Sequence, residues 1–378
     1  MTDRLDLQDK LRRFTSSKRL RGCGCWRIDG GKDVEQHVGT TEDGERVSYL
    51  TNVQRCGSPW ICPTCGPKIR QQRAGEIETA ALAHIEQGGA LYTMIVTLPH
   101  NAPDWLSVTW DVLAQGYRRM MGGRGWRRDR ETYGIEGYIR ADEVTHGVNG
   151  WHPHAHPLLF TAGSLSDNEL EALADNLHGR WSRYVQRRGF RAPARHLCAL
   201  APVRSREGIA AYIVKAGLDG QDHAKRLGLE MARGDLKRGE RDGVKRTESV
   251  WEIAERAAAG SERDRELWRE YERDSKGKWP VRWSRGLKAR YGIGEASDEE
   301  LAAKEAETRP EETLSVSPGE WDIVWKTPGA RSALRLIHEL LGRQRAREFV
   351  AATVAAHVEK TLRSYVRDDG TRAERAPP

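Results

Sequence analysis

"GWHPHAHPLLF", residues 150–160, places three histidines at alternate positions just before an apolar run. Side chains two apart in a β-strand point to the same face, so His152, His154 and His156 would share one face of an extended segment. Neighbouring imidazoles pack poorly in a core but form half of a site for a divalent metal ion. The stretch therefore predicts a strand that carries metal ligands, although Pro157 removes a ladder donor and counts against a central strand.

The residues before the histidines offer a third ligand. "IEGYIRADEV" (135–144) alternates as a strand does, and "THGVNG" (145–150) supplies turn residues, which together predict a hairpin. Glu143 shares a face with apolar neighbours, where a carboxylate needs a cation, so we expect Glu143 to be the third ligand. Asp142 is the alternative, because a one-residue change of register swaps the faces.

Three ligands with open coordination positions are typical of a catalytic metal site. Oxygen and imidazole ligands favour Mg²⁺ or Mn²⁺, and zinc is also compatible with them. The competing interpretation is a surface strand whose histidines bind no metal.

A candidate nucleophile lies further along the chain, in "SREGIAAYIVKAGL" (205–218). Tyr212 and Lys215 are three apart in this expected helix and so are neighbours on its surface. A free tyrosine has a pKa of about 10, and a nearby ammonium would favour the phenolate and could hold a phosphate. Glu207 is a candidate base. The competing interpretation is a tyrosine packed in the core.

The cysteines indicate a second metal site. Five of them lie between residues 23 and 65, and no apolar segment at the N-terminus resembles a secretion signal, so metal ligation is expected rather than disulfides. Cys56, Cys62 and Cys65, together with Cys23 or Cys25, would make a structural zinc site. A redox Cys-x₂-Cys is the alternative, but no βαβ pattern surrounds it.

Charge favours a polyanionic partner. The 378 residues carry a formal net charge of +7, from 62 basic and 55 acidic side chains, so the distribution of charge matters more than its sum. The basic run "YRRMMGGRGWRRDR" (117–130) makes Arg124, Arg127 and Arg128 candidates for phosphate contacts, with a solvated loop as the alternative. No apolar run is long enough to cross a bilayer, so we expect a cytoplasmic protein with no membrane partner.

The order of elements predicts an α+β fold, with a central antiparallel sheet, flanking helices and a further mainly helical C-terminal region. A buried central strand is expected at 91–100. Helices are expected at 68–89, 105–122, 164–189 and 207–218.

Composition suggests the following division of the chain. We expect a polar N-terminal arm at 1–22, a cysteine-rich zinc module at 23–70, a nuclease domain at 71–220, a basic helical region with a role in origin binding at 221–295, an acidic linker at 296–315, a small helical segment at 316–366 and a disordered tail at 367–378.

Taken together, these motifs resemble a known family. "TMIVTLPH", "EVTHGVNGWHPHAHPLLF" and "AAYIVK" follow one another like the three motifs of rolling-circle replication initiators of bacterial plasmids, in the HUH (histidine–hydrophobic–histidine) endonuclease superfamily. "CGSPWICPTCGPKIRQQRAGEIE" resembles the zinc-knuckle segment of the plasmid Rep branch, and "LWREYERDSKGKWPVRWSRGLKARYG" resembles a downstream stretch of that branch. The resemblance spans about residues 20–290.

The resemblance implies roles for individual residues. His154 and His156 would be the paired metal ligands, Glu143 the acidic ligand, Tyr212 the nucleophile and Lys215 the lysine that positions phosphate or metal. For zinc, Cys23 matches the family pattern better than Cys25.

Three positions depart from the family pattern. Ala155 is a small middle residue in the histidine motif, and Pro157 stands where valine is usual. Gly208 occupies the place of a glutamate that activates water in some members, which leaves the role of the neighbouring Glu207 open.

The family's activity would be to nick single-stranded origin DNA, giving a 5′-phosphotyrosine and a free 3′-hydroxyl, with Mg²⁺ or Mn²⁺ at the catalytic site and structural Zn²⁺ at the cysteines. Its partners would be the plasmid origin, as a single-stranded nick site and as duplex, and the host helicase and DNA polymerase. Two other functions stay open. A relaxase or single-strand transposase shares the histidine and tyrosine chemistry, and a zinc-ribbon DNA-binding regulator would lack catalysis.

Overall fold

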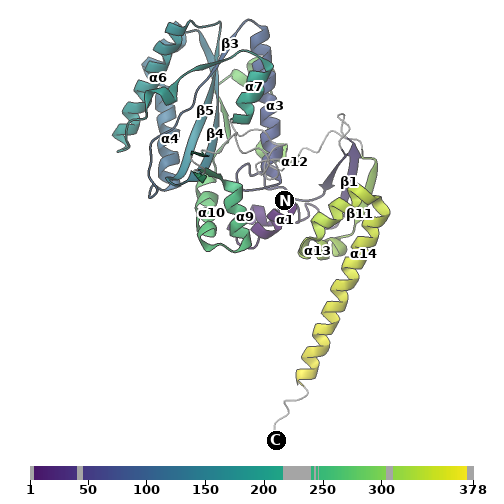
Figure 1. The fold of residues 1–378 in the computed structure, drawn as a ribbon. Coiled ribbons are helices and arrows are strands. Elements are labelled where there is room, and N and C mark those ends of the chain that lie inside the picture. The colour runs from purple at the N-terminus through teal and green to yellow at the C-terminus, as the bar shows by residue number, and fades with distance from the viewer. Residues whose placement is uncertain are drawn as a thin grey trace. The chain divides into compact units, whose positions relative to one another are not determined.

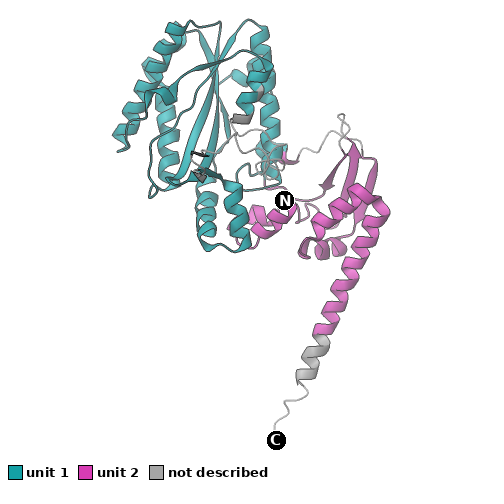
Figure 2. Cartoon of the chain, viewed as in Figure 1, with its two compact units in different colours: residues 1, 57–301 teal, residues 2–56, 302–378 magenta. Residues whose placement is uncertain are grey.

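The computed structural model describes residues 4–40, 46–215, 240–241, 244–245, 247–303 and 310–372. The chain divides into two compact units (Figure 2). Unit 1 consists of residue 1 and residues 57–301, and unit 2 consists of residues 2–56 and 302–378. Both units are discontinuous in sequence, which differs from the consecutive ranges expected above.

Unit 1 is built around an antiparallel sheet (Figure 1). Its strands are β3 (Ala90–Thr93), β4 (Ile135–Gly147), β5 (Gly150–Thr161), β6 (Ala201–Val203), β9 (Thr247–Ser249) and β10 (Val281–Trp283), with β7 (Glu240–Arg241) and β8 (Val244–Lys245) as a separate pair. Its helices are α3 (Cys65–Glu86), α4 (Leu106–Met120), α5 (Gly123–Thr132), α6 (Asp167–Arg187), the 3₁₀ helix η1 (Arg195–Cys198), α7 (Arg206–Lys215), α9 (Val250–Ala259), α10 (Glu262–Ser275) and α11 (Leu287–Arg290). Helix α12 (Asp298–Ala303) begins in unit 1 and runs past residue 301, where this unit ends.

The strands run in the order β10-β4-β5-β3-β6, and β9 pairs with the far end of β4. The prediction of an α+β fold with an antiparallel sheet between helices is therefore confirmed. Both β9 and β10 come from the range 221–295, which was expected to be helical. They pair with β4 because that long strand would otherwise leave one edge of backbone groups without partners.

The central hairpin is β4–β5, whose two-residue connection is Val148-Asn149, between Gly147 and Gly150. Strand β4 continues through Gly147, three residues beyond its expected end. Gly150 has φ +79°, and a Cβ there would lie 3.0 Å from the carbonyl oxygen of Ala102. Only glycine suits this position, because it must adopt a left-handed conformation under a closely packed backbone.

Helices cover both faces of the sheet, with α3 and α7 on one face and α4 and α6 on the other (Figure 1). On the first face, Ile77, Ile139, Leu158 and Ile209 belong to one buried cluster. On the second, the indole N–H of Trp181 in α6 donates to the carbonyl of Thr97 at 2.9 Å. Burial on both faces explains why the strand sequences are so rich in apolar residues.

Strand β3 ends at Thr93, well before the end of the expected range 91–100, and Pro157 lies opposite the next residue, Met94. The Met94 N–H donates to the Pro157 carbonyl at 3.2 Å, but proline has no N–H with which to return the bond. The pairing resumes in the same register at Val96, which exchanges both backbone hydrogen bonds with Ala155. Pro157 thus lies in an interior strand and interrupts the ladder at a single position.

Unit 2 is formed by both ends of the chain. Its elements are α1 (Arg4–Leu11), α2 (Lys18–Gly22), β1 (Val34–Thr40), β2 (Arg46–Thr51), β11 (Glu312–Val316), α13 (Pro318–Lys326) and α14 (Ala330–Arg372), with strand order β11-β1-β2. Strand β11 pairs with β1, from Val34 opposite Val316 onward. Buried Trp321 of α13 and Val350 of α14 pack in the same cluster as Val34 and Val316.

Several C-terminal expectations change. The range 296–315, expected as a linker, holds α12 and most of β11. The helical prediction for the C-terminal region is confirmed, and α14 extends to Arg372, into the expected tail, whereas residues 373–378 lie outside the described residues. Gly342 breaks α14 with φ 80° and ψ 178°, and Glu312 accepts the backbone N–H of Arg343 at 2.7 Å, which caps the second segment. None of the described helices is long and apolar enough to span a membrane.

Candidate functional site

Hairpin register brings the predicted metal ligands together. Glu143 on β4 pairs directly with His154 on β5, and residues directly opposite in an antiparallel pair share a face. One Glu143 carboxylate oxygen lies 3.1 Å from Nε2 of His154 and 3.3 Å from Nε2 of His156. Donor atoms of the three residues lie within 4.8 Å of one another, so the group could hold a metal ion.

The donor set fits a divalent cation. Nδ1 of His154 donates to the carbonyl oxygen of His152 at 3.2 Å, because a carbonyl can only accept. Nε2 of His154 therefore keeps the lone pair that a metal needs and faces Glu143. Two imidazole nitrogens and one carboxylate oxygen leave further coordination positions for substrate or water.

Asp142, the alternative ligand, points away from this group. It forms a buried ion pair with Arg140, whose Nη2 lies 2.9 Å from the carboxylate. The Arg140 guanidinium lies over the ring of Tyr117 in α4, 4.5 Å from its centroid, which places both charges on the opposite face of the sheet. In the observed register, Glu143 faces the histidines and Asp142 does not.

His152, the remaining predicted ligand, contacts His100 and Thr97 and not Glu143. Its Nδ1 lies 2.8 Å from Nε2 of His100, and its Nε2 lies 3.1 Å from the hydroxyl of Thr97. Burial, with additional effects from His154 and His100, lowers the pKa of His152 to about 3, so the ring is neutral at physiological pH. Its ring is next to that of His154, with centroids 5.1 Å apart.

Tyr212 of α7 lies on the same face as the paired histidines. It is 2% exposed, and its hydroxyl donates to the backbone carbonyl of His156 at 2.9 Å. Burial raises the pKa of Tyr212, which is opposite to the effect expected from a neighbouring ammonium. Helix α7 ends at Lys215, whose side chain lies outside the described residues. Glu207 is exposed in the first turn of α7, where backbone and Ser205 hydrogen bonds lower its pKa.

Four cysteines form the second group. Cys23, Cys56, Cys62 and Cys65 are all buried, and their sulfur atoms lie within 4.8 Å of one another. Four thiolates at this spacing are suited to tetrahedral zinc. The backbone N–H of Cys65 donates to Sγ of Cys62 at 3.3 Å, a contact that favours the thiolate.

Cys25 is absent from the cysteine group, as the family pattern implied. Its sulfur contacts the Arg12 guanidinium, and burial raises the pKa of its thiol. Two cysteines separated by one residue, Cys23 and Cys25, thus have different surroundings.

A "Protein rep" from Streptomyces lividans is 32% identical to this chain over 306 residues, which is 65% of the chain and 66% of that protein. This match supports a plasmid Rep protein. A "Neomycin resistance protein" from Streptomyces cyanogenus is 33% identical over 135 residues, 29% of this chain and 31% of that protein. The chain therefore covers slightly less than two thirds of the first relative and about a third of the second. No family model and no solved structure matches it. The paired histidines and the tyrosine helix are consistent with the HUH superfamily.

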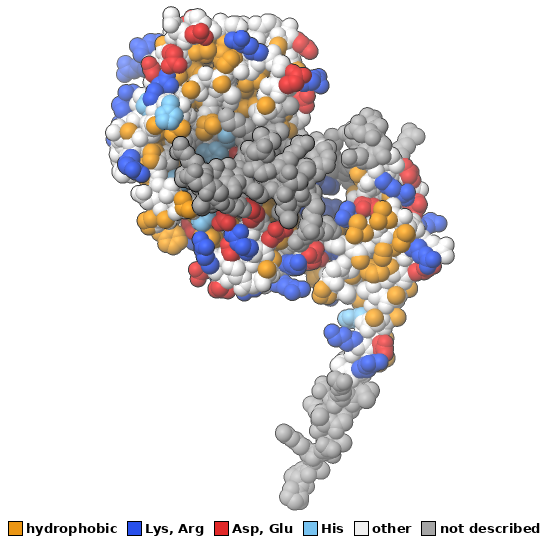
Figure 3. Space-filling view, viewed as in Figure 1, with side chains coloured by type: hydrophobic (Ala, Val, Ile, Leu, Met, Phe, Trp, Pro, Cys, Tyr) orange, Lys and Arg blue, Asp and Glu red, His pale blue; other side chains and the backbone are white. Residues whose placement is uncertain are grey.

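The basic run of this chain is helical, not a loop. In α5, Trp126 is buried with its ring 6.0 Å from that of Tyr138, and buried Asp129 pairs with Arg180 of α6. These two anchors fix one face of α5 against unit 1. Arg124, Arg127 and Arg128 are exposed on the opposite face, together with Glu131. On the side of unit 1 seen in Figure 3, basic and acidic side chains are interspersed.

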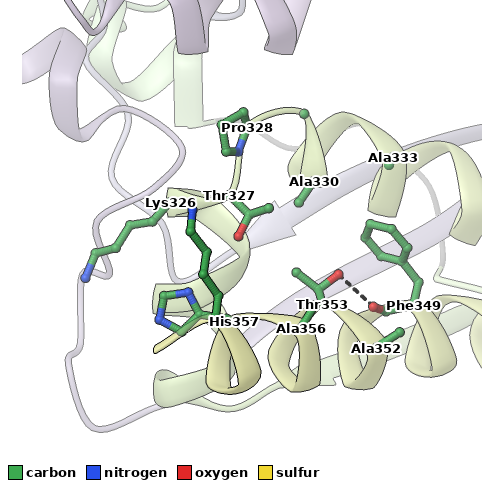
Figure 4. A pocket seen from close by; sticks show the side chains of 12 residues that line it. Lys326, Thr327, Pro328, Ala330, Ala333, Phe349, Ala352, Thr353, Ala356 and His357 are labelled. Atoms are coloured by element: carbon green, nitrogen blue, oxygen red, sulfur yellow. Dashed lines mark hydrogen bonds between the residues drawn. The ribbon is translucent and has the colours of Figure 1, made fainter. Parts of the chain in front are cut away.

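Unit 2 carries a groove of about 800 Å³ between the start of α14 and its second segment (Figure 4). Its floor is apolar, with Ala330, Ala333 and Phe349. Lys326 and Lys360 add two positive charges to its lining. Its lining residues include no Asp or Glu.

Two contributors near the metal group were not singled out from the sequence. His100 closes the run "TMIVTLPH" and contacts His152, and its position after an apolar strand was the available signal. Arg70 of α3 is buried, with its guanidinium 5.0 Å from the ring centroid of Trp60. Burial lowers the pKa of Arg70 and negative charges including that of Glu143 oppose the shift, so Arg70 adds a positive charge to the surroundings of the site.

Proposed function

We propose that this chain initiates rolling-circle replication of a plasmid by cutting one strand of origin DNA. The observation that carries the proposal is the convergence of Glu143, His154 and His156 on one face of the hairpin, with Tyr212 held against the backbone of His156. Cleavage of a phosphodiester bond requires a nucleophile and a cation close together. No other group among the described residues combines a tyrosine with metal-binding side chains in this way.

Glu143, His154 and His156 would hold Mg²⁺ or Mn²⁺. Such an ion supplies Lewis-acid polarisation of a phosphate oxygen, an effect worth several kcal/mol. The hydrogen bond from His154 to the His152 carbonyl keeps the ligand nitrogen oriented toward Glu143. The neutral, half-buried His152 packs beside His154 and limits its rotation.

In the reaction, the Tyr212 oxygen forms a bond to phosphorus while the bond from phosphorus to the 3′-oxygen breaks. The phenolic proton passes to a base or to solvent, and the leaving 3′-oxygen takes up a proton to become a 3′-hydroxyl. One phosphoester replaces another, so the reverse step can rejoin strands without ATP. Because Tyr212 is buried and hydrogen-bonded, the hydroxyl must leave the His156 carbonyl before it attacks. Lys215 would position the phosphate, and Glu207 is the candidate for activating water at termination.

The other elements would bind DNA or support the fold. Arg124, Arg127 and Arg128 on the exposed face of α5 would contact phosphates, which gives affinity without sequence selectivity. The cysteine group would bind structural Zn²⁺. Unit 2, with the cationic groove, would bind duplex origin DNA. The free 3′-hydroxyl would be extended by host DNA polymerase, with a host helicase, in the bacterial cytoplasm.

The decisive experiment uses a single-stranded origin oligonucleotide with Mn²⁺ and looks for an adduct that survives denaturation. Wild type should form it and Tyr212→Phe should not. Tyr271→Phe is the matched control: Tyr271 is also buried, and its hydroxyl also faces a backbone carbonyl, that of Trp60 at 3.5 Å. This control should retain adduct formation.

The outcomes separate the alternative functions. A protein that binds the oligonucleotide but never forms an adduct would be a binding regulator, and the proposal would fail. An adduct with a transfer-origin or transposon-end oligonucleotide, and none with a replication origin, would indicate a relaxase or a transposase.

A further inference from the structure

Trp279 lies between α10 and β10 and is 53% exposed. The tryptophans of the same unit at positions 60, 110, 181 and 268 are buried. Trp105 of the same unit is also exposed, at 61%, so the position of Trp279 and not its exposure alone is informative. Its neighbours along the strand show where it lies.

The pairing of β10 with β4 brings the segment of Trp279 to the metal group. Val281 pairs with Ala141, and the Asp142 N–H donates to the carbonyl of Pro280 at 2.8 Å. Pro280 is therefore next to Asp142, the chain neighbour of Glu143. Trp279 is the residue just before Pro280, where the chain bends ahead of β10.

The residues that flank Trp279 reach opposite faces of the sheet. Val281 belongs to the buried cluster that contains Ala141, on the face of the histidines. Lys278 reaches the other face, where its Nζ lies 5.5 Å from the ring centroid of Trp110 in α4. Trp279 lies between them at the edge of the sheet, with its indole exposed.

The backbone around Trp279 is held on both sides. The indole N–H of Trp60 donates to the carbonyl of Lys278 at 2.9 Å, and Pro280 accepts from Asp142. Lys276 and Arg285 of the same segment are exposed and add positive charge. An exposed aromatic ring on a backbone held at both neighbouring carbonyls, in a segment that also carries cations, is suited to a nucleobase on a phosphate backbone.

We propose that Trp279 stacks on a base of the single-stranded DNA, next to the phosphate that reacts at the metal group. The proposal rests on the proposed function for its substrate and adds the residue that holds the strand. Stacking requires an unpaired base, so Trp279 would select single-stranded over duplex DNA at this position.

The test measures binding of a fluorescein-labelled single-stranded origin oligonucleotide to the full chain by anisotropy, without divalent metal. Trp279→Ala should weaken binding by about 5- to 150-fold, the range for loss of one base-stacking contact. Trp279→Phe should retain most of the affinity. Trp105→Ala is the matched control, because Trp105 is also exposed, at 61%, but lies before α4 on the other side of the sheet.

A duplex of the same sequence provides the specificity readout, since its affinity should not change in Trp279→Ala. Equal single-strand affinities of Trp279→Ala and wild type would overturn the proposal, as would an equal loss in Trp105→Ala. If wild type forms no adduct but Trp279→Ala still loses single-strand binding, the proposed nicking fails and the stacking role stands. If wild type forms the adduct and Trp279→Ala binds normally, only the stacking role fails.

Discussion

The hydroxyl of Tyr212 lies 2.9 Å from the backbone carbonyl oxygen of His156, whose imidazole faces the Glu143 carboxylate. The sheet residue that offers a metal ligand through its side chain therefore also holds the tyrosine through its backbone. Any movement of α7 that releases the phenol must break this hydrogen bond, whereas the metal group can stay in place because it lies on the β4–β5 hairpin.

Tyr212→Phe should separate stability from chemistry. Loss of one buried hydrogen bond is expected to lower the free energy of unfolding by about 1 kcal/mol, with the ring still packed against the sheet. Adduct formation should be lost completely. Urea unfolding and the adduct assay measure the two effects, and a stability loss large enough to unfold the variant at 25 °C would contradict the packing argument.

Glu143→Gln should weaken Mn²⁺ binding at least about tenfold, because the amide removes the only carboxylate of the group. Titration of Mn²⁺ followed by electron paramagnetic resonance provides the measurement. Glu136→Gln on the same strand is the control, since Glu136 pairs with Arg290 and lies outside the group. Unchanged Mn²⁺ affinity in Glu143→Gln would exclude the proposed ligand set.

Asp142→Asn should lower stability and leave Mn²⁺ affinity unchanged, the opposite of Glu143→Gln. It leaves the Arg140 guanidinium buried without its carboxylate, which costs about 3–5 kcal/mol of stability. The folded fraction should bind Mn²⁺ like wild type, because Asp142 faces away from the histidines. Thermal unfolding and the Mn²⁺ titration test both points, and a selective loss of Mn²⁺ affinity in a stable variant would reverse the assignment of the two acidic residues.

Cys23→Ser should reduce bound zinc by up to one equivalent per chain, whereas Cys25→Ser should leave the zinc content unchanged. The two substitutions remove the same atom from one short loop, so they differ mainly in ligation. Elemental analysis of the purified variants decides between them. A zinc loss confined to Cys25→Ser would show that the ligand has been assigned to the wrong cysteine.

Stability of unit 2 should depend on acid pH through Glu320. The Arg347 guanidinium, with Ser317 hydrogen bonds, lowers the pKa of Glu320 from 4.5 to about 2. Because the pKa of Glu320 is lower in the folded state, its ionised carboxylate stabilises the folded state above pH 4.5. This stabilisation is lost as the pH falls toward 2. Glu320→Gln should therefore cost about 1–3 kcal/mol at pH 7, and the difference from wild type should shrink below pH 4.5 in urea titrations. Glu348→Gln, which removes an exposed pair with Arg345, should show little change at either pH.

Local patterns predicted the elements around the candidate site well. The helix expected at 68–89 is α3 at Cys65–Glu86, and the helix expected at 164–189 is α6, with a capping box between Ser166 and Glu169. These signals are local, because a cap and a run of apolar residues act within a few turns. The length of β3 was harder to predict, since it depends on pairing with the strand beside it.

The identity of the third ligand shows the limit of sequence patterns. Glu143 and Asp142 are adjacent carboxylates, and alternation alone allows either to face the histidines. The pairing of Glu143 with His154 resolves the choice, and that pairing depends on the two-residue turn at Val148-Asn149. The cation that holds Asp142 on the other face is Arg140, two residues away on the same strand.

By itself, the sequence determined the order of the motifs, the presence of a histidine strand and a cysteine cluster, and the helices whose apolar faces repeat locally. Tertiary structure decided which carboxylate meets the histidines, which cysteine joins the group, that Tyr212 is buried, and that β9, β10 and β11 pair with strands far away in the chain. The physical reason is that helices and turns are stabilised by neighbours in sequence, whereas strand partners and side-chain surroundings depend on segments that only folding brings together.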